Sequence, residues 1–310
     1  MSQPAPEVGS PEPVGEESEF GGREEIVLWE GLPLMPSVVR CWDGIQNFAA
    51  RPDDILIATY PKAGTTWVVE MVDAVLAEGD MSRCLRIPTF NRAPFLELNP
   101  LPPFPSGLQL LQSMPSPRLV KTHFPVHLVP QSFWDNDCKV VYVARNGKDN
   151  MVSYFHFQRM NQKLPEPGTW DEYFTASLNG QVSWGSWFDH VTGWWKAKEK
   201  RNILYLFYED MKEDPAREIT RLAKFLGKGL DQAVIDRIVD HTSFSSMKDN
   251  PMTNYTVLPS FVFNHSVSPF MRKGEVGSWK TQFTVSQNER FDEEYRRRMT
   301  DPSLIFRTEL

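Results

Sequence analysis

The sequence has little cysteine and lacks the motifs that hold catalytic metals. Its 310 residues contain three cysteines, Cys41, Cys84 and Cys138, which lie far apart and form no Cys-x-x-Cys pair. The six histidines include no His-Glu-x-x-His motif, and we predict no metal site. An odd number of scattered cysteines is typical of reduced thiols, which favours a cytoplasmic protein over a disulfide-stabilised secreted one.

Long apolar runs and a basic N-terminus are also missing. No stretch approaches the ~20 apolar residues of a membrane span, and the acidic start is unlike a signal peptide. Residues 1–25 hold seven acids and one base, a net charge of −6, so they account for most of the total charge of −7. This Pro-rich segment has almost no large apolar residues, and we expect residues 1–25 to be disordered and residues 26–310 to form the folded domain. Nothing indicates a nucleic-acid surface.

What the chain does contain is an alternation of apolar and helical segments. Four short apolar runs are predicted as strands, over residues 54–60, 118–122, 139–144 and 203–208. Helical patterns cover residues 67–76, 147–160, 186–198, 215–226 and 232–241. Strands that are apolar throughout are typical of parallel sheets covered on both faces. We therefore predict a single α/β domain with a central parallel sheet flanked by helices and ligand sites at the carboxyl ends of its strands.

Two long segments do not fit this alternation. Residues 88–117 contain eight prolines, which predicts a surface loop. Residues 248–277 are irregular too, but they are rich in phenylalanine, methionine and basic residues. Long loops inside a domain are usually lids, binding loops or disordered segments, and the aromatic content favours a lid.

The most informative motif lies between Ile55 and Trp67. An apolar strand leads into the turn Pro61-Lys-Ala-Gly64, and two threonines then open a helix. Unpaired backbone N–H groups at a helix start converge on an anion, and Lys62 would add a positive charge, so the motif predicts a P-loop-like phosphate cradle. A strict Walker A motif cannot be placed here, which weakens an NTPase interpretation. A plain strand-to-helix turn remains the structural alternative.

Basic residues follow the other predicted strands. Arg145 ends one strand, and Ser153 lies one turn into the next helix, an arrangement that suits a second phosphate. Lys121 and His123 end another strand, where an imidazole could act as a general base. A third basic cluster occupies Arg272-Lys-Gly274. The alternatives are a solvated arginine beside a helix cap, an ordinary surface histidine and a solvated loop tip.

Taken together, these motifs resemble the cytosolic sulfotransferases, most closely the phenol-sulfating branch, from about residue 30 to the C-terminus. The matching motifs are Thr59-Tyr-Pro-Lys-Ala-Gly-Thr-Thr-Trp67, Lys121-Thr-His123, Tyr142-Val-Ala-Arg-Asn-Gly-Lys-Asp149 with Ser153-Tyr154, Tyr208-Glu-Asp-Met211, His241-Thr-Ser-Phe244, Asn250-Pro-Met-Thr-Asn-Tyr255 and Arg272-Lys-Gly274.

The resemblance implies 3′-phosphoadenosine 5′-phosphosulfate (PAPS) as sulfonate donor, its desulfonated form PAP as product, and no metal. It assigns His123 as the base and Lys62 and Lys121 as cations that stabilise the transition state. The donor-binding positions it implies are Lys62, Ala63, Gly64, Thr65, Thr66, Trp67, Arg145, Ser153, Tyr208, Thr242, Phe244, Met271, Arg272, Lys273 and Gly274. The acceptor positions it implies are Val38, Phe95, Lys121, His123, Phe157, Trp184, Tyr255, Val262 and Phe263.

The resemblance also implies a homodimer, formed through Lys280, Thr284, Val285 and Glu289. The chain departs from many family members at Ala63, where a serine is common, but the backbone cradle does not need that hydroxyl. Residues at Trp184, Val262 and Phe263 vary among members, so the sequence leaves open which small phenol or related hydroxyl compound is the acceptor. Two other classes remain as alternatives, a nucleotide kinase-like enzyme and a non-catalytic nucleotide-binding member.

Overall fold

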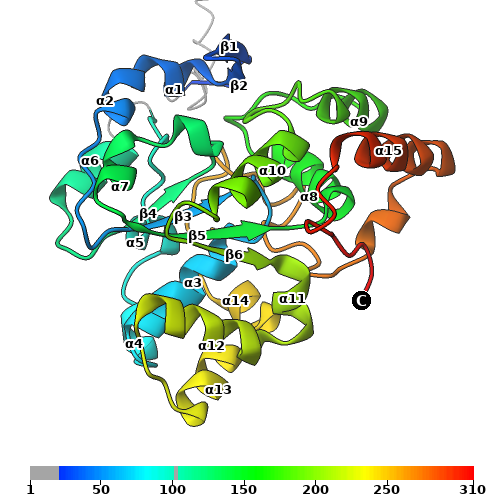
Figure 1. Cartoon of the computed structure of the whole chain (residues 1–310). Helices are drawn as coiled ribbons and strands as arrows, with labels where there is room; N and C mark the ends of the chain where they lie inside the picture. Colours follow the sequence, from blue (N-terminus) through cyan, green and yellow to red (C-terminus); the bar gives the residue numbers. More distant parts are fainter. Residues whose placement is uncertain (1–20, 101–103) are drawn as a thin grey trace, which may run out of the picture.

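A four-stranded parallel sheet lies at the centre of the protein, whose computed structural model describes residues 21–100 and 104–310 (Figure 1). The strands are β3 (Ile55–Thr59), β4 (Leu119–Thr122), β5 (Lys139–Ala144) and β6 (Ile203–Phe207), in the order β4-β3-β5-β6. Each coincides with a predicted strand to within one or two residues at its ends. The predicted fold class, a single α/β domain with a parallel sheet between helices, is confirmed.

Alternate side chains of each central strand point into two separate hydrophobic cores, one on each face of the sheet. On β3, Leu56 and Ala58 face one core, whereas Ile55 and Ile57 face the other. Because successive side chains of a strand point to opposite faces, a strand buried on both sides must be apolar at every position. This geometry explains why the strands lack a polar alternation in the sequence.

Helices cover both faces of the sheet. One face carries α3 (Thr65–Leu76), α12 (Pro215–Leu226) and α13 (Gln232–His241), which lie below the sheet in Figure 1. The other carries α8 (Gly147–Met160) and α10 (Trp187–Ala197). All five were predicted with nearly the observed boundaries. Two further helices, α9 (Trp170–Leu178) and α15 (Val285–Arg298), lie outside α8 at the upper right of Figure 1.

Several short elements escaped prediction. They are the hairpin β1 (Val27–Trp29) and β2 (Leu32–Leu34), the helices α1 (Pro36–Arg40), α2 (Trp42–Gln46), α4 (Met81–Cys84), α5 (Thr89–Arg92), α6 (Gly107–Ser113), α7 (Gln131–Asp135), α11 (Tyr208–Glu213) and α14 (Phe244–Asp249), and the 3-10 turns Val126–Leu128 and Ser278–Thr281. Two of these helices interrupt the expected loop 88–117. The start of α6 is fixed by a capping box between Ser106 and Gln109.

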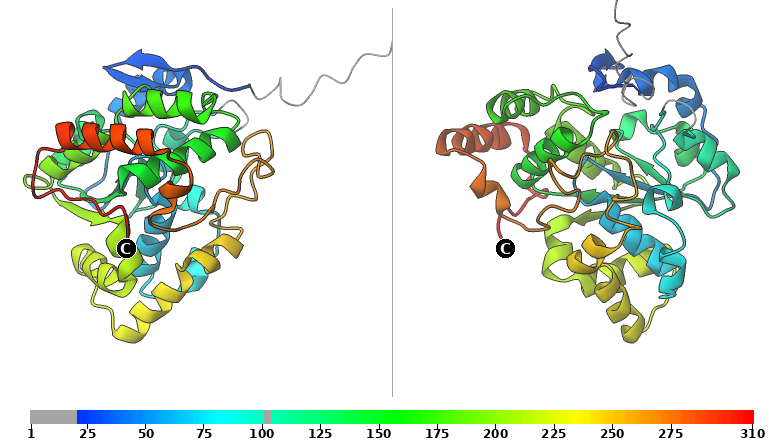
Figure 2. Two further views of the ribbon diagram at one scale, coloured as in Figure 1. Left: turned by 90° about the vertical axis from the view of Figure 1, so that its right-hand side faces the viewer. Right: turned by 180° about the vertical axis from the view of Figure 1, so that it is seen from behind.

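The second expected loop is irregular, as predicted, from residue 250 to 277. It crosses the molecule on the side that faces the viewer in the right panel of Figure 2, where it is orange. The predicted disordered tail lies outside the described residues except for residues 21–25, which make specific contacts with the domain. Within the described residues, no helix is both long and apolar enough to cross a bilayer.

Candidate functional site

Four chemistry-bearing residues come directly after the four parallel strands. His123 follows β4, Arg145 follows β5 and Tyr208 follows β6, while the turn containing Lys62 follows β3. Since the carboxyl ends of parallel strands meet at one edge, the sheet brings together residues far apart in the sequence. β3 lies between β4 and β5, so its turn opens at the point where the strand order reverses, which is where α/β sheets bind ligands.

The turn after β3 holds an unusual backbone conformation. Lys62 has φ 67° and Gly64 has φ 110°, and Gly64 occupies the N-cap of α3 without any side-chain cap. The first N–H groups of α3 are thus left for an external anion, as the sequence predicted. A non-glycine residue at positive φ costs on the order of 1–3 kcal/mol, and such strain is concentrated at functional sites. Ala63 is fully buried beneath the turn.

A single cavity of about 680 Å³ unites the predicted residues. Every predicted donor and acceptor position except Ala63 lines it: Val38, Lys62, Gly64, Thr65, Thr66, Trp67, Phe95, Lys121, His123, Arg145, Ser153, Phe157, Trp184, Tyr208, Thr242, Phe244, Tyr255, Val262, Phe263, Met271, Arg272, Lys273 and Gly274. Residues separated by more than two hundred positions in the chain therefore share one site.

Positive charge accumulates in this cavity, which also holds the carboxylates of Glu24 and Glu97. Among residues 21–100 and 104–310, no acidic side chain lies within ion-pair distance of Lys62, Arg145 or Arg272. Burial and the charges of Arg145, Arg272 and Lys121 lower the pKa of Lys62 to about 7. The Nε atoms of Arg145 and Arg272 and the indole nitrogen of Trp67 are buried without a hydrogen-bond partner. Such orphaned donors and crowded cations fit an anionic ligand.

The imidazole of His123 is held in one tautomer. Its Nδ1 lies 2.8 Å from the backbone oxygen of Thr59, and because a carbonyl oxygen can only accept, Nδ1 carries the proton. Nε2 is then a bare acceptor. Burial and the charge of Lys121 lower the pKa of His123 to about 3, so the ring is neutral near pH 7. His123 therefore has the protonation state that a general base needs.

Buried polar groups fix the backbone of His123 from two sides. Glu97 accepts hydrogen bonds from the Thr122 hydroxyl at 2.9 Å and from the His123 N–H at 2.8 Å. Burial raises the pKa of Glu97 to about 7. On the other side, His190 donates from Nε2 to the oxygen of His123 at 3.0 Å and accepts from the Tyr142 hydroxyl at 2.7 Å. The sequence analysis missed Glu97 and His190, for which no local pattern exists.

Aromatic rings pack around His123 in the half of the cavity where the acceptor positions are predicted. The ring centroids of Phe95 and Trp184 lie 4.9 Å and 5.3 Å from that of His123. Trp184 and Tyr255 adopt φ 64° and 63°, so three of the six non-glycine residues at positive φ in the described chain, Lys62 included, line this cavity. Its backbone strain thus coincides with the predicted site.

Lys62 lies between the two halves of the cavity. Its Nζ is 3.8 Å from the ring centroid of Phe270 and 4.4 Å from that of Phe157. Phe270 and Phe90, which the sequence analysis did not assign to the acceptor half, pack on Tyr255 with centroids 4.2 Å and 5.4 Å away. Aromatic faces attract a cation and can hold the ammonium until an anion arrives.

The end of the cavity around Trp67 combines flat rings with a tight glycine. Trp67 and Tyr208 meet edge to face at 5.4 Å, and the guanidinium of Arg145 lies 4.3 Å from the Tyr208 ring. Gly274 has φ 65°, and a Cβ there would overlap the ring of Phe244. Only glycine allows the basic loop to approach Phe244 this closely.

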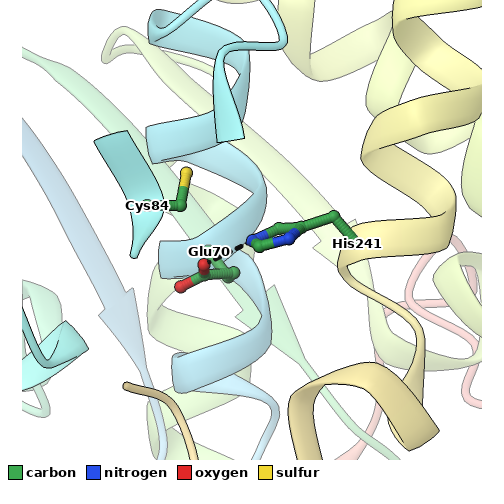
Figure 3. A group of neighbouring side chains, drawn as sticks. All are labelled: Glu70, Cys84 and His241. Atoms are coloured by element: carbon green, nitrogen blue, oxygen red, sulfur yellow. Dashed lines mark hydrogen bonds and ion pairs between the residues drawn. The ribbon is translucent and has the colours of Figure 1, made fainter. Parts of the chain in front are cut away.

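One cluster below the cavity has the residue types of a metal site. Glu70, Cys84 and His241 lie within 4.8 Å of one another (Figure 3). Both carboxylate oxygens of Glu70 are engaged, one with His241 Nε2 at 2.8 Å and the other with the buried guanidinium of Arg92 at 2.6 Å. Burial and the neighbouring Asp73 and Glu70 raise the pKa of the Cys84 thiol to about 12, so the side chain is a neutral thiol, and the Arg92 guanidinium already supplies a positive charge to Glu70. The donor set does not fit a cation.

Comparison with known proteins matches most of the chain. The family model described as "Sulfotransferase domain" covers residues 52–302. Sulfotransferase 1C2 of rabbit is 56% identical over 290 residues, spanning 94% of this chain and 98% of the rabbit protein. Human sulfotransferase 1C2 is 54% identical over 94% of this chain and 99% of its own, and mouse sulfotransferase 1 family member D1 is 52% identical over 93% and 97%.

Solved structures agree with this result. Retinol dehydratase in complex with androsterone and inactive cofactor PAP superimposes with a TM-score of 0.81 and 26% identity, covering 89% of each chain. The mouse sulfotransferase SULT7A1 complexed with PAP gives a TM-score of 0.74 and 31% identity, covering 89% of this chain and 95% of the mouse chain.

Proposed function

The chain belongs to the sulfotransferase family, and from that premise we propose that it transfers the sulfonate group of PAPS to the hydroxyl of a small phenol, with His123 as the base. The observation that carries this proposal is the pairing of a cation cluster with a neutral histidine in one cavity. The cations suit a donor with two separate anionic groups, the 3′-phosphate and the 5′-phosphosulfate. The histidine suits an acceptor hydroxyl that must lose its proton.

The donor would occupy the cation-rich half. The open N–H groups at the start of α3, with Thr65, Thr66 and Lys62, would hold the phosphosulfate. Arg145, Ser153 and the loop from Met271 to Gly274 would hold the 3′-phosphate, and the unpaired Nε atoms of Arg145 and Arg272 support this placement. Trp67, Tyr208, Thr242 and Phe244 would frame the base.

The chain's own residues then have separate tasks in the transfer. The bound donor supplies an activated sulfonate next to the acceptor. His123 takes up the proton of the substrate hydroxyl at Nε2. The hydrogen bond from Nδ1 to Thr59 holds the ring proton on Nδ1 and so leaves Nε2 unprotonated. Lys62 and Lys121 place positive charge where negative charge develops, in a cavity whose low dielectric strengthens the effect. Positioning and fixed cations supply most of the acceleration, as in phosphoryl transfer.

The acceptor half favours a planar phenol. Its walls are mainly aromatic and aliphatic, with Val38, Phe157, Val262 and Phe263 around the rings beside His123. A dry slot with a single base selects an apolar ring whose hydroxyl is acidic enough to be deprotonated easily.

Transfer of radiolabelled sulfonate from PAPS tests the proposal. We expect transfer to small phenols to exceed transfer to steroids, with catecholamines and iodothyronines included in the same panel. Activity should be unchanged in EDTA, since no proposed step uses a metal, and undiminished activity would exclude a nucleotide kinase-like enzyme, which should need magnesium. PAP binding without transfer to any acceptor would mark a non-catalytic member.

Two further assignments belong to the same proposal. We propose a homodimer that uses Lys280, Thr284, Val285 and Glu289, supported by the side chain of Val285, which is apolar and 77% exposed at the start of α15. We also propose that the protein works in the cytoplasm, in keeping with the free thiols of all three cysteines.

A further inference from the structure

Four residues that precede the domain proper lie along the acceptor side of the cavity. Residues 21–24, here termed the N-terminal strap, line it together with Phe261 and Val262. Arg23 is the centre of the strap, with a side chain only 22% exposed. Its guanidinium donates to four backbone oxygens, those of Gln158 (2.8 Å), Arg159 (2.9 Å), Asn161 (2.8 Å) and Leu164 (3.0 Å), and its Nε lies 2.8 Å from the Glu166 carboxylate.

These oxygens belong to the end of α8 and the turn that follows it. The last carbonyl groups of a helix have no partner within the helix. A cation at that end also interacts favourably with the negative end of the helix dipole. α8 carries Ser153 on the donor half and Phe157 on the acceptor half of the cavity. One arginine thus completes the hydrogen bonding of a helix end that leads directly into the site.

The same turn holds the irregular loop of the acceptor half. Gln162 donates from its backbone N–H to the oxygen of Val262 at 2.9 Å, and Asn264 donates to the oxygen of Met160 at 2.8 Å. Residues Val262 and Phe263 therefore depend for their position on the turn that Arg23 fixes. These two hydrogen bonds form the antiparallel bridge between Asn161 and Phe263, and the loop belongs to no strand of either sheet.

The strap is tied to a second wall of the cavity by Glu24. Its backbone N–H donates to the oxygen of Lys163 at 3.2 Å, and its carboxylate accepts from the backbone N–H of Ser37 at 2.9 Å. Ser37 and its neighbour Val38 both line the cavity. Two adjacent side chains of the strap therefore connect α1 to the end of α8 across the acceptor side.

We propose that Arg23 is a positioning residue for the acceptor, because it fixes the end of α8 and, through it, the loop of Val262 and Phe263. This inference rests on the proposed sulfotransferase function. Its chemistry favours arginine, since Nη1 shares its two N–H groups among three carbonyl oxygens while Nη2 donates to a fourth and Nε faces a carboxylate, whereas a lysine ammonium offers three donors from one atom. Acceptor affinity, rather than donor affinity or the chemical step, should depend on it.

Steady-state kinetics with PAPS and 2-naphthol test the proposal. We expect Arg23→Ala to raise KM for 2-naphthol about tenfold while kcat and KM for PAPS change less than about twofold, the pattern of lost ground-state positioning. Arg23→Lys should fall between this variant and the wild type. Glu166→Gln, which removes only the ion pair of an exposed glutamate, should shift the same KM in the same direction by less. The control is Arg297→Ala on α15, where the arginine pairs with Glu294 at the surface.

An unchanged KM for 2-naphthol in Arg23→Ala would overturn the proposal, and so would equal changes in both KM values. Hydrogen exchange without any ligand provides a second measurement. Arg23→Ala should speed exchange in peptides covering residues 158–165 and 259–264 but not in α3. If the wild type transfers sulfonate to no phenol, the proposed function fails, and the exchange result alone then supports or refutes the positioning role.

Discussion

The imidazole Nδ1–H of His123 donates to the backbone oxygen of Thr59 at 2.8 Å. Thr59 is the last residue of β3, and its hydroxyl lies 2.7 Å from that of Thr65, the first residue of α3. A single strand end therefore orients His123, the proposed base, and contacts the start of α3, the proposed phosphate site. The two halves of the proposed reaction share one rigid support, which keeps the base and the loop in register with each other.

Removal of the base should lower turnover without loss of the donor site. We expect His123→Ala to reduce kcat by at least about 10²-fold, since a positioned general base contributes 10²–10⁴-fold. PAP affinity, measured by calorimetry, should be unchanged because Nε2 faces the acceptor half. The matched control is His127→Ala, which alters an exposed histidine four residues away. Full activity in His123→Ala would refute the assignment.

The lowered pKa of Lys62 predicts how donor capture varies with pH. With a pKa of about 7 in the free enzyme, Lys62 is an ammonium below pH 7 and loses its proton as the pH rises through 7. An anionic donor prefers the ammonium, so kcat/KM for PAPS should fall about tenfold per pH unit above this point. Because the pKa of His123 is about 3, no acidic limb from that residue is expected between pH 5 and 7.

Two variants identify the group whose titration causes this decline in kcat/KM. Lys62→Arg should remove the decline above pH 7, because a guanidinium stays protonated. Glu97→Gln should preserve it, although Glu97 also titrates near pH 7. If the decline above pH 7 disappears in Glu97→Gln but persists in Lys62→Arg, the titrating group is the carboxyl group of Glu97 and not the amine of Lys62.

The close approach of Gly274 to Phe244 predicts a donor-specific defect. Gly274→Ala places a Cβ in the Phe244 ring at a positive φ, so the basic loop or the ring must move. We expect KM for PAPS to rise about tenfold or more, with KM for the acceptor unchanged. Gly229→Ala is the control, since a Cβ there meets nothing within 4 Å and its φ is ordinary. Equal effects of the two substitutions would contradict this interpretation.

The buried pairing of Arg92 with Glu70 and Asp73 predicts a large stability loss. Arg92 and Glu70 are fully buried, and the Arg92 guanidinium lies 2.6 Å from Glu70 and 2.5 Å from Asp73. Arg92→Met leaves buried Glu70 with only His241 and Asp73 with only the longer ion pair to Arg86 at 3.2 Å, which should lower the free energy of unfolding by about 3–5 kcal/mol in urea titrations. Arg297→Ala, which breaks an exposed pair, should leave the midpoint unchanged. Similar midpoints for both variants would show that the cluster is not a stabilising centre.

Exposed Val285 predicts the oligomeric state. If the protein dimerises through this residue, Val285→Glu should convert the dimer to a monomer in sedimentation velocity, because a carboxylate in an apolar contact loses its hydration without compensation. Thr284 still caps α15 in this variant, so the helix itself should persist. Leu28→Glu, at another exposed apolar position, is the control. A wild type that sediments as a monomer would exclude the proposed dimer.

The sheet and its functional edge were accessible to sequence reasoning because their signals are local. A fully apolar strand such as β5 must be covered on both faces, and the residue that follows it, Arg145, must lie at the edge where parallel strands end. The same reasoning predicts His123 and Lys62 at one edge of the sheet, and both residues line the same cavity.

Glu97 and Arg23 illustrate what local signals omit. Glu97 lies within the proline-rich segment 88–117, which has no periodic pattern, and its position beside His123 depends on a short parallel pairing between Phe95 and Lys121. Arg23 lies in a segment whose composition predicts disorder, because composition takes no account of four hydrogen bonds from one guanidinium to a turn about 140 residues away. The positions of Glu97 and Arg23 are therefore both determined by contacts with residues far away in the sequence.

The order of the central strands also has an evolutionary consequence. Lys62, His123 and Arg145 are fixed by adjacent strands of a backbone ladder, whereas Val262 and Phe263 belong to a loop with little regular pairing. Substitutions, insertions or exchanges in that loop can alter which molecules enter the cavity while the ladder preserves the geometry of the reacting groups. After gene duplication, changes confined to this loop can thus alter the range of acceptors while the proposed reacting residues keep their positions.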